Sequence, residues 1–335
     1  MSALAGAPTP ATTAKARVAP RARVSRARAF VARDGADYDF DRRAALLAGG
    51  LLASTLALPE PAALAASTSL AERVERRDLS KPVFNKARPG PTRFPDWLEG
   101  TWRCTSTFEG FDFPSKNINK NALLKEPTVP GFQKMSLVYV PDVGTSDVEY
   151  LVRFVRANDG DGGVCEDRVF NLKSIVDAYL KRPDAVEAVE YDAASDANRV
   201  TVRLAPGVSN NAERIELFSN ARESETRASD GTFFAAEALR QVTLGYSKDY
   251  NKARVVNTDY QHVWSYTPTY ESDGSIRRVR CALSTAGYIQ PSDAMRLTAM
   301  PNLGCGAPVP SMGNMGNASF EPAVLYSHTI VMERV

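Results

Sequence analysis

The segment Ala323–Val335 reads AVLYSHTIVMERV, and its pattern decides the fold class. Every second residue from Val324 to Met332 falls on one face of an extended chain, and that face is largely apolar. Polar residues such as Thr329 lie on the other face. A period of two with one apolar face is typical of a β-strand in a sheet that is solvated on one side. The segment VRCALSTAGYI (279–289) has the same period.

Similar segments recur at short intervals and are separated by turn sequences such as Ser272-Asp273-Gly274. One short helix is predicted at Ser174–Leu180, and the Gly-, Pro- and Asn-rich residues 301–320 are predicted to form a long surface loop. The candidate strands, in chain order, are Thr101–Phe108, Phe132–Val140, Val148–Val155, Val164–Asn171, Ala185–Tyr191, Arg199–Leu204, Arg214–Ser219, Ala238–Tyr246, Tyr260–Thr267, Ile276–Ile289 and Val324–Arg334.

So many strands with so little helix predict an all-β fold with few short helices, either a single antiparallel barrel or a sandwich. Closure into a barrel removes exposed strand edges, and such a barrel can enclose a small-ligand cavity. Gly100-Thr101-Trp102 resembles the first strand of lipocalins and other calycins, whose Trp plugs the closed end of the barrel. We therefore expect a calycin-like β-barrel over residues 93–335, in which the first and last strands pair. The alternative is that Trp102 is a core residue of another β fold.

The start of the chain has the composition of a targeting sequence. Residues 1–33 contain no Asp or Glu and are rich in Ala, Arg, Ser, Thr and Pro, so they cannot bury enough apolar surface to fold. We interpret residues 1–40 as a disordered chloroplast transit peptide. A basic tail that binds nucleic acid is the alternative interpretation.

A second signal is predicted at residues 41–66. Arg42 and Arg43 precede the uncharged residues 44–59, and Ala63-Leu64-Ala65 has the small-x-small pattern of a cleavage site. The paired arginines favour a twin-arginine signal for the thylakoid lumen, with cleavage just after Ala65. A retained membrane anchor is the alternative, although the apolar run is shorter than the ~20 residues that span a bilayer.

The chain beyond this leader is not basic. After residue 66 the acidic side chains slightly outnumber the basic ones, which argues against a nucleic-acid partner. Residues 67–92 are polar, contain several prolines and show no apolar period, so they are predicted to be an irregular lead-in. The chain has only two histidines, His262 and His328, which nearly excludes a His-rich metal site. We expect neither a metal nor a cofactor.

A ligand cavity would be lined by aromatic residues that point inward and by arginines within strands. Arg168, in EDRVFN (166–171), and Arg240 either anchor a carboxylate group of a ligand or form structural Asp–Arg pairs. Cys281 and Cys305 could form a disulfide that ties down the long loop, and buried free thiols are the alternative. The candidate cavity residues are Trp102, Arg168, Arg240, Tyr246, Tyr288 and Tyr326.

Several segments, in order along the chain, resemble a known family. Together they are similar to the plant and algal thylakoid-lumen family named domain of unknown function 6816, over about residues 92–335. The resemblance implies a β-rich fold and a lumenal location, and it implies no activity, substrate or catalytic residue. The segments are FPDWLEGTW (94–102), EDRVFN (166–171), ALRQVTLGY (238–246), VRCALSTAGYI (279–289) and AVLYSHTIVMERV (323–335).

The sequence leaves several hypotheses for the function. The first is a non-catalytic β-barrel that binds a small apolar ligand, such as a pigment or a lipid. The second is an auxiliary or assembly factor that contacts a photosystem or another photosynthetic membrane complex through an exposed apolar patch. The third, a pigment- or lipid-modifying enzyme, would require Asp167 or another acid inside a cavity beside aromatic walls. No stable membrane span is expected after processing.

Overall fold

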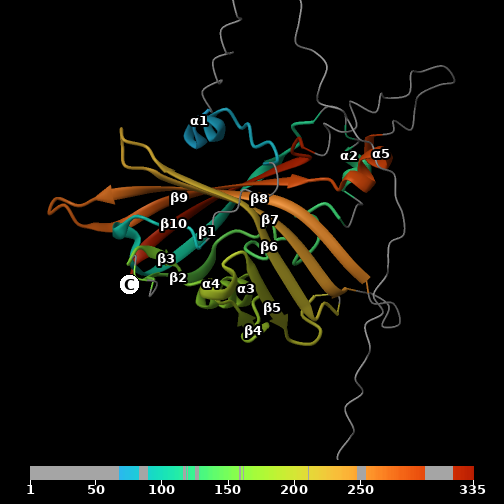
Figure 1. Ribbon diagram of the computed structural model, residues 1–335, viewed down its shortest axis with the longest axis horizontal. Helices are drawn as coiled ribbons and strands as arrows, with labels where there is room; N and C mark the ends of the chain where they lie inside the picture. Colours follow the sequence, from blue (N-terminus) through green and yellow to red (C-terminus); the bar gives the residue numbers. More distant parts are fainter. Residues whose placement is uncertain are drawn as a thin grey trace, which may run out of the picture. The chain divides into compact units, whose positions relative to one another are not determined.

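The computed structural model (Figure 1) describes residues 68–82, 90–115, 118, 120–124, 128–157, 160, 162–209, 211–246, 254–298 and 320–335. The chain divides into two units, Met1–Glu60 and Pro61–Val335, and every described residue belongs to the second. The predicted transit peptide and export signal, including Arg42, Arg43, Ala63 and Ala65, lie outside the described residues.

Within the described ranges, ten strands form one antiparallel sheet in the order β3-β2-β1-β10-β9-β8-β7-β6-β5-β4. The prediction of a mainly β fold with few short helices is therefore confirmed. The strands are β1 (Gly100–Asp112), β2 (Val148–Arg156), β3 (Val164–Glu166), β4 (Val186–Glu190), β5 (Arg199–Leu204), β6 (Arg214–Thr226), β7 (Phe233–Tyr246), β8 (Arg254–Tyr270), β9 (Ile276–Tyr288) and β10 (Val324–Arg334).

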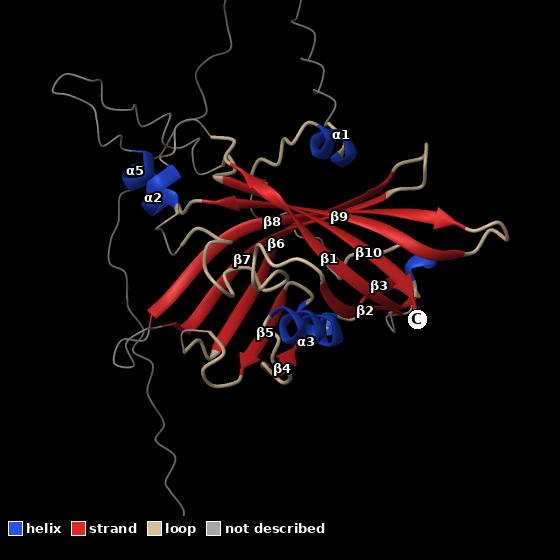
Figure 2. Cartoon of the chain, turned by 180° about the vertical axis from the view of Figure 1, so that it is seen from behind, coloured by secondary structure: helices blue, strands red, loops and turns tan. Residues whose placement is uncertain are grey.

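The sheet curls into an open half-barrel, so the prediction of a closed barrel is wrong (Figure 2). Its two edges are β3 and β4, which do not pair with each other. The reason lies in the chain after β2. Strand β3 is only three residues long, and the chain then turns into a helix instead of a strand that could reach β4.

The first and last strands pair, as the sequence predicted. Trp102 lies opposite Arg334, and Phe108 lies opposite His328, in an antiparallel ladder between β1 and β10. Strand β10 pairs with β9 on its other side. The pair places the Gly100-Thr101-Trp102 segment beside the C-terminal end of the chain.

The predicted strand Val164–Asn171 is split into β3 and the helix α3 (Arg168–Tyr179). Asp167 causes the change, because its carboxylate accepts a hydrogen bond from the backbone N–H of Phe170 at 3.1 Å and thereby caps the helix N-terminus. The helix predicted at Ser174–Leu180 is therefore present but begins six residues earlier.

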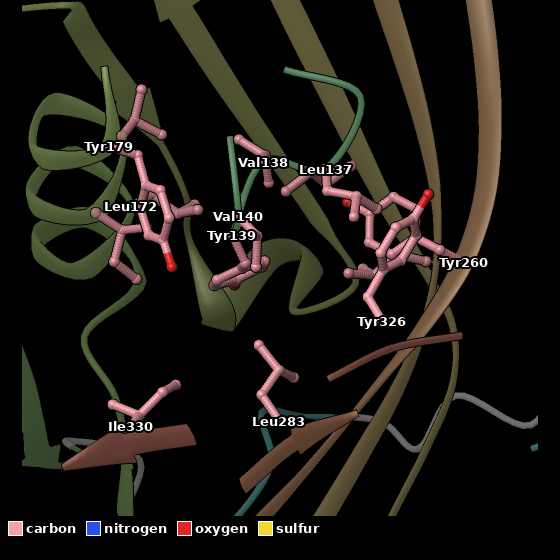
Figure 3. Packing of buried hydrophobic residues seen from close by; sticks show 14 of the residues in the cluster. Leu137, Val138, Tyr139, Val140, Leu172, Tyr179, Tyr260, Leu283, Tyr326 and Ile330 are labelled. Atoms are coloured by element: carbon pink, nitrogen blue, oxygen red, sulfur yellow. The ribbon is translucent and has the colours of Figure 1, made fainter. Parts of the chain in front are cut away.

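The predicted strand Phe132–Val140 is a series of turns on the concave face of the sheet. Some of its backbone groups pair within the turns, and others pair with a side chain of the sheet. The N–H of Val138 donates to Gln241 Oε1 at 3.2 Å, and Gln241 Nε2 donates to the Met135 carbonyl at 2.6 Å. Figure 3 shows Leu137–Val140 between α3 and the tyrosines of the sheet. All four residues are buried in the half-barrel's interior.

The convex face carries a second, smaller core. The segment 68–82, predicted to be irregular, contains α1 (Leu70–Glu75), and α1 and α3 lie on opposite faces of the sheet (Figures 1 and 2). Leu70 and Leu79 pack against Val263 and Tyr288. The other short helices are η1 (Asp96–Leu98), α2 (Lys120–Leu123), α4 (Ala193–Asp196) and α5 (Pro291–Thr298). In the part of the chain that is described, no helix has the length and apolar character of a membrane span.

Candidate functional site

The concave face holds a cavity of about 60 Å³ between the sheet and α3. Its walls come from β1, β2, β3, β8, β9, β10 and α3, together with Phe94 before β1 and Tyr139 from the turns before β2. Most of the lining is apolar and aromatic. The aromatic members are Phe94, Tyr139, Tyr150, Phe154, Trp264 and Tyr266.

Phe94 joins the aromatic walls into one continuous surface. Its ring centroid lies 4.9 Å from that of Phe154 and 6.1 Å from that of Tyr266. The Phe94 backbone is held by an isolated bridge to the edge strand, in which its N–H donates to the Val164 carbonyl at 2.9 Å. The cavity wall therefore depends on the segment before β1 as well as on the sheet.

Glu166, the last residue of β3, brings a carboxyl group to this aromatic wall. Its side chain is 18% exposed, and Asn171 Nδ2 donates to its Oε1 at 3.3 Å. Arg168 Nε lies 3.8 Å from the other oxygen. Burial raises the pKa of Glu166, the Arg168 charge lowers it in part, and the Glu237 charge raises it further. The carboxyl is thus poorly compensated where it faces the cavity.

Beside Glu166 lies a buried cluster built on Glu237 of β7. Arg168 Nη2 donates to both oxygens of Glu237 at 2.7 Å, and Arg222 Nε donates to Oε1 at 2.8 Å. Ser219 also donates to this carboxylate. Burial alone would raise the pKa of Glu237, but the charges of Arg168 and Arg222 and the hydrogen bonds from Arg168 and Ser219 lower it to about 2. Glu237 therefore stays ionised and neutralises one of the two positive charges beside it.

A smaller cavity of about 20 Å³ lies next to the first, and Glu166, Phe94 and Trp264 line both. Arg168 lines the smaller one. Arg168 Nη1 and Tyr139 Oη are buried and have no hydrogen-bond partner among the described residues. Polar atoms without partners are rare in protein interiors and point to a bound molecule or ordered water nearby.

Both histidines are buried and neutral. His262 Nδ1 lies 2.8 Å from Thr285 Oγ1, while its Nε2 and both ring nitrogens of His328 have no partner within the described ranges. Burial lowers the pKa of His262 to about 3 and that of His328 to about 4. Over the described part of the chain, no group of three or more His, Cys, Asp or Glu side chains could hold a metal ion.

The structure places the predicted site residues apart from one another. Trp102 and Tyr326 are buried on the concave side but do not line the cavity, and Arg168 lines only the smaller one. Trp102 donates its indole N–H to the Leu98 carbonyl at 2.8 Å. The side chain of Tyr246 lies outside the described residues.

Arg240 and Tyr288 lie on the convex face, so they cannot reach the concave cavity. Arg240 donates to both oxygens of Asp259 at 2.8 and 2.9 Å, and Lys81 Nζ lies 2.6 Å from the same carboxylate. Tyr288 Oη donates to the Leu79 carbonyl at 2.7 Å. Both residues hold the segment 68–82 against the sheet, which makes the Asp–Arg pair structural.

Two of the cysteines line the cavity. Cys104 and Cys281 are buried free thiols, and burial raises the pKa of both. The structure thus gives Cys281 no disulfide, and Cys305, its possible partner in sequence, lies outside the described residues.

Sequence reasoning missed the residues that line the cavity. Glu166 stands first in the EDRVFN segment and Phe94 first in FPDWLEGTW, so both lay within segments already noted. Their partners come from distant strands, such as Trp264 and Tyr266 on β8. Spacing along the chain does not reveal that assembly.

Comparison with known proteins gives one match. The sequence profile of a family described as domain of unknown function (DUF6816) matches residues 86–304, which include the cavity residues Phe94 and Glu166. No curated protein and no solved structure matches the chain.

Proposed function

This chain belongs to the domain of unknown function (DUF6816) family, and we propose that it is a binding protein that holds a small molecule in the cavity on the concave face of its sheet. The observation that carries the proposal is the Glu166 carboxyl within an aromatic cavity. Cavities of this kind, largely apolar with few polar groups, are the usual form of a small-molecule site.

The size of the cavity limits the ligand. About 60 Å³ is enough for several water molecules, because a water needs only about 10–15 Å³ of such space. Sites for drug-sized ligands occupy about 300–1,000 Å³. A pigment or lipid, the ligand suggested by the sequence, would need the turns at Leu137–Val140 to move out of the half-barrel. The geometry therefore favours a ligand of a few non-hydrogen atoms.

The proposal includes a location and a fold relationship. The composition of residues 1–66 supports import into the chloroplast and export to the thylakoid lumen. A calycin-like ancestry is supported by the buried Trp102 at the start of β1 and by the pairing of β1 with β10. An import assay with isolated chloroplasts tests the location, and recovery of the full-length chain in the stroma would contradict it.

Native mass spectrometry of the protein purified from its source tests the binding function. We expect a bound small molecule in the wild type. Val152→Leu should reduce its occupancy, because Val152 lines the cavity and leucine adds a methylene group there. The matched control, Val331→Leu, adds the same group at a residue that is 38% exposed. Equal occupancy in both variants would contradict binding at this cavity.

A surface role is the second candidate, because an aromatic cluster lies exposed at the end of β1. Phe111 is 54% exposed, and its ring contacts Phe113 at a centroid distance of 5.4 Å and Phe132 at 6.5 Å. Such a patch suits an auxiliary factor that contacts a photosynthetic membrane complex. Phe111→Ser should then reduce co-purification with that complex, and unchanged co-purification would contradict the role.

Glu166 also provides the acid inside an aromatic cavity that a catalytic role requires. The nucleophiles that line the same cavity are the thiols of Cys104 and Cys281, and burial keeps both protonated by raising their pKa. Thiols are poor nucleophiles in that form. The geometry therefore favours binding over catalysis.

A further inference from the structure

The carboxylates of Glu237 and Glu166 both lie close to the Arg168 guanidinium, but at different distances. Its Nη2 lies 2.7 Å from each oxygen of Glu237, whereas its Nε lies 3.8 Å from Glu166. Nη2 alone makes both short contacts, and Nη1 has no hydrogen-bond partner among the described residues, so Arg168 is ion-paired mainly with Glu237. Glu166 is therefore the more distant of the two carboxylates beside Arg168.

Glu237 has further partners that Glu166 lacks. Arg222 donates to it at 2.8 Å, and Ser219 donates to the same oxygen. Glu166 accepts one side-chain hydrogen bond at 3.3 Å, from Asn171. The cluster holds two guanidinium groups and two carboxylates, and Glu166, on the wall of the larger cavity, is the more weakly paired carboxylate.

The other walls of that cavity suit a cation. A carboxylate that loses its water without gaining a close cationic partner is costly, so the site gains most from an occupant of opposite charge. Aromatic rings attract cations through the negative charge of their faces. Phe94, Phe154 and Tyr266 form such a continuous aromatic surface beside Glu166.

Resting on the binding function proposed above, we infer that the cavity takes a small ammonium group, an alkylammonium ion of about two to four non-hydrogen atoms. Its N–H groups donate to the Glu166 carboxylate, and its alkyl carbons contact the rings of Phe94 and Tyr266. The cation thus gives Glu166 a closer charged partner than Arg168, whose Nε lies 3.8 Å away. A neutral molecule of the same shape would fill the cavity without forming an ion pair with Glu166.

Isothermal titration with ethylammonium and with ethanol, at constant ionic strength and pH 8, separates charge from shape. The two probes have the same number of non-hydrogen atoms. We expect ethylammonium to bind the wild type about tenfold more tightly than ethanol, because an ion pair with the carboxylate replaces a hydrogen bond from an uncharged hydroxyl. Glu166→Gln should remove this difference. Glu149→Gln, which deletes the same charge at an exposed position on β2, should retain it.

A second measurement uses the wild type alone and guards against misfolding of the Glu166 variant. The charged groups that act on Glu166 are Arg168, Asp167 and Glu237, and Asn171 adds a hydrogen bond. With burial, the net effect is a raised pKa. Ethylammonium affinity should therefore fall as the pH is lowered through that pKa, while ethanol affinity stays constant. A pH-independent affinity for ethylammonium would overturn the inference.

The outcomes distinguish the inference from the proposed function. Preference for ethylammonium that depends on Glu166 supports both. Equal binding of the two probes keeps the cavity as a binding site and overturns the cationic ligand. Absence of binding by either probe overturns both, because the smallest molecules that fit the space would then fail to enter it.

Discussion

Asn171 of α3 hydrogen-bonds both backbone groups of Arg153 on β2. Its Oδ1 accepts from the Arg153 N–H at 2.7 Å, and its Nδ2 donates to the Arg153 carbonyl at 3.2 Å. One turn later, Ser174 Oγ accepts from the Leu151 N–H at 3.0 Å. Side chains of a helix thus take the place of a neighbouring strand, on the edge of β2 that the short β3 leaves uncovered.

Asn171→Leu should lower the free energy of unfolding by about 1–2 kcal/mol, because the Arg153 N–H loses its partner, while the Arg153 carbonyl keeps the Asp167 N–H at 3.0 Å. Urea titration followed by circular dichroism measures the change. Asn257→Leu, at an exposed position on β8, is the control and should change stability by less than about 0.5 kcal/mol. Equal effects of the two variants would show that the edge contact contributes nothing.

Glu237→Gln should destabilise the fold by about 3–5 kcal/mol, because it leaves Arg168 and Arg222 buried without their carboxylate. The comparison is Glu190→Gln, which breaks an exposed pair with Arg203 and should cost about 1 kcal/mol or less. Thermal unfolding of both variants tests the contrast. A small loss for Glu237→Gln would contradict the central place of this cluster in the core.

Acidification should destabilise the protein through its two histidines. Both have folded-state pKa values below the ordinary 6.5, about 3 for His262 and about 4 for His328. The unfolded chain therefore binds more protons below pH 6.5, and stability falls as the pH decreases. Between pH 7 and pH 5 each histidine should account for about 2 kcal/mol. Unfolding measured across this range gives the slope.

His328→Leu isolates one half of this effect. The substitution removes two ring nitrogens that have no partner among the described residues, so stability at pH 7 should stay equal or rise slightly. The loss between pH 7 and pH 5 should shrink by about 2 kcal/mol. Glu166, whose pKa is raised, acts in the opposite direction above pH 4.5 and is unchanged in this comparison. An unaltered slope would exclude His328 as a source.

Arg334→Lys should destabilise the fold by about 1 kcal/mol. The Arg334 guanidinium lies 4.4 Å from the Trp102 ring and donates to the carbonyls of Glu99, Trp97 and Ile276. Lysine keeps the charge but cannot reach three carbonyls at once. Arg280→Lys, at an exposed site on β9, is the matched control, and a similar loss there would contradict the argument.

The alternation within 323–335 was enough to predict β10 and the face of Tyr326, and the resemblance of Gly100-Thr101-Trp102 to a calycin first strand added the pairing with β1. Local signals failed where a single contact overrides propensity, as with the Asp167 cap that turns a strand pattern into α3. The same applies to Val138, whose backbone is paired by the distant Gln241. Two segments rich in β-branched and aromatic residues, 164–171 and 132–140, therefore contain the start of a helix and a series of turns instead of strands.

The site was harder to predict than the fold. Period two shows that Tyr288 and Cys281 lie on opposite faces of β9, but it does not show which face carries the cavity. The Glu166 environment depends on β7, β8 and α3, which meet only in the folded chain. The weak pairing of Glu166 arises because Arg168 lies closer to Glu237, and the spacing of these residues along the chain does not show this.

Helix α3 meets the opposite edge of the sheet in the same way. Lys173 Nζ donates to the Val186 carbonyl on β4 at 3.0 Å, and Asp177 accepts from the Val186 N–H at 3.0 Å. The same helix supplies Asn171 and Ile175 to the cavity wall. Lifting α3 to admit a ligand would therefore strip both strand edges of their partners at once. Uncovered edges are templates for aggregation, so an occupied cavity would protect the folded chain from self-association as well as slow the release of its ligand.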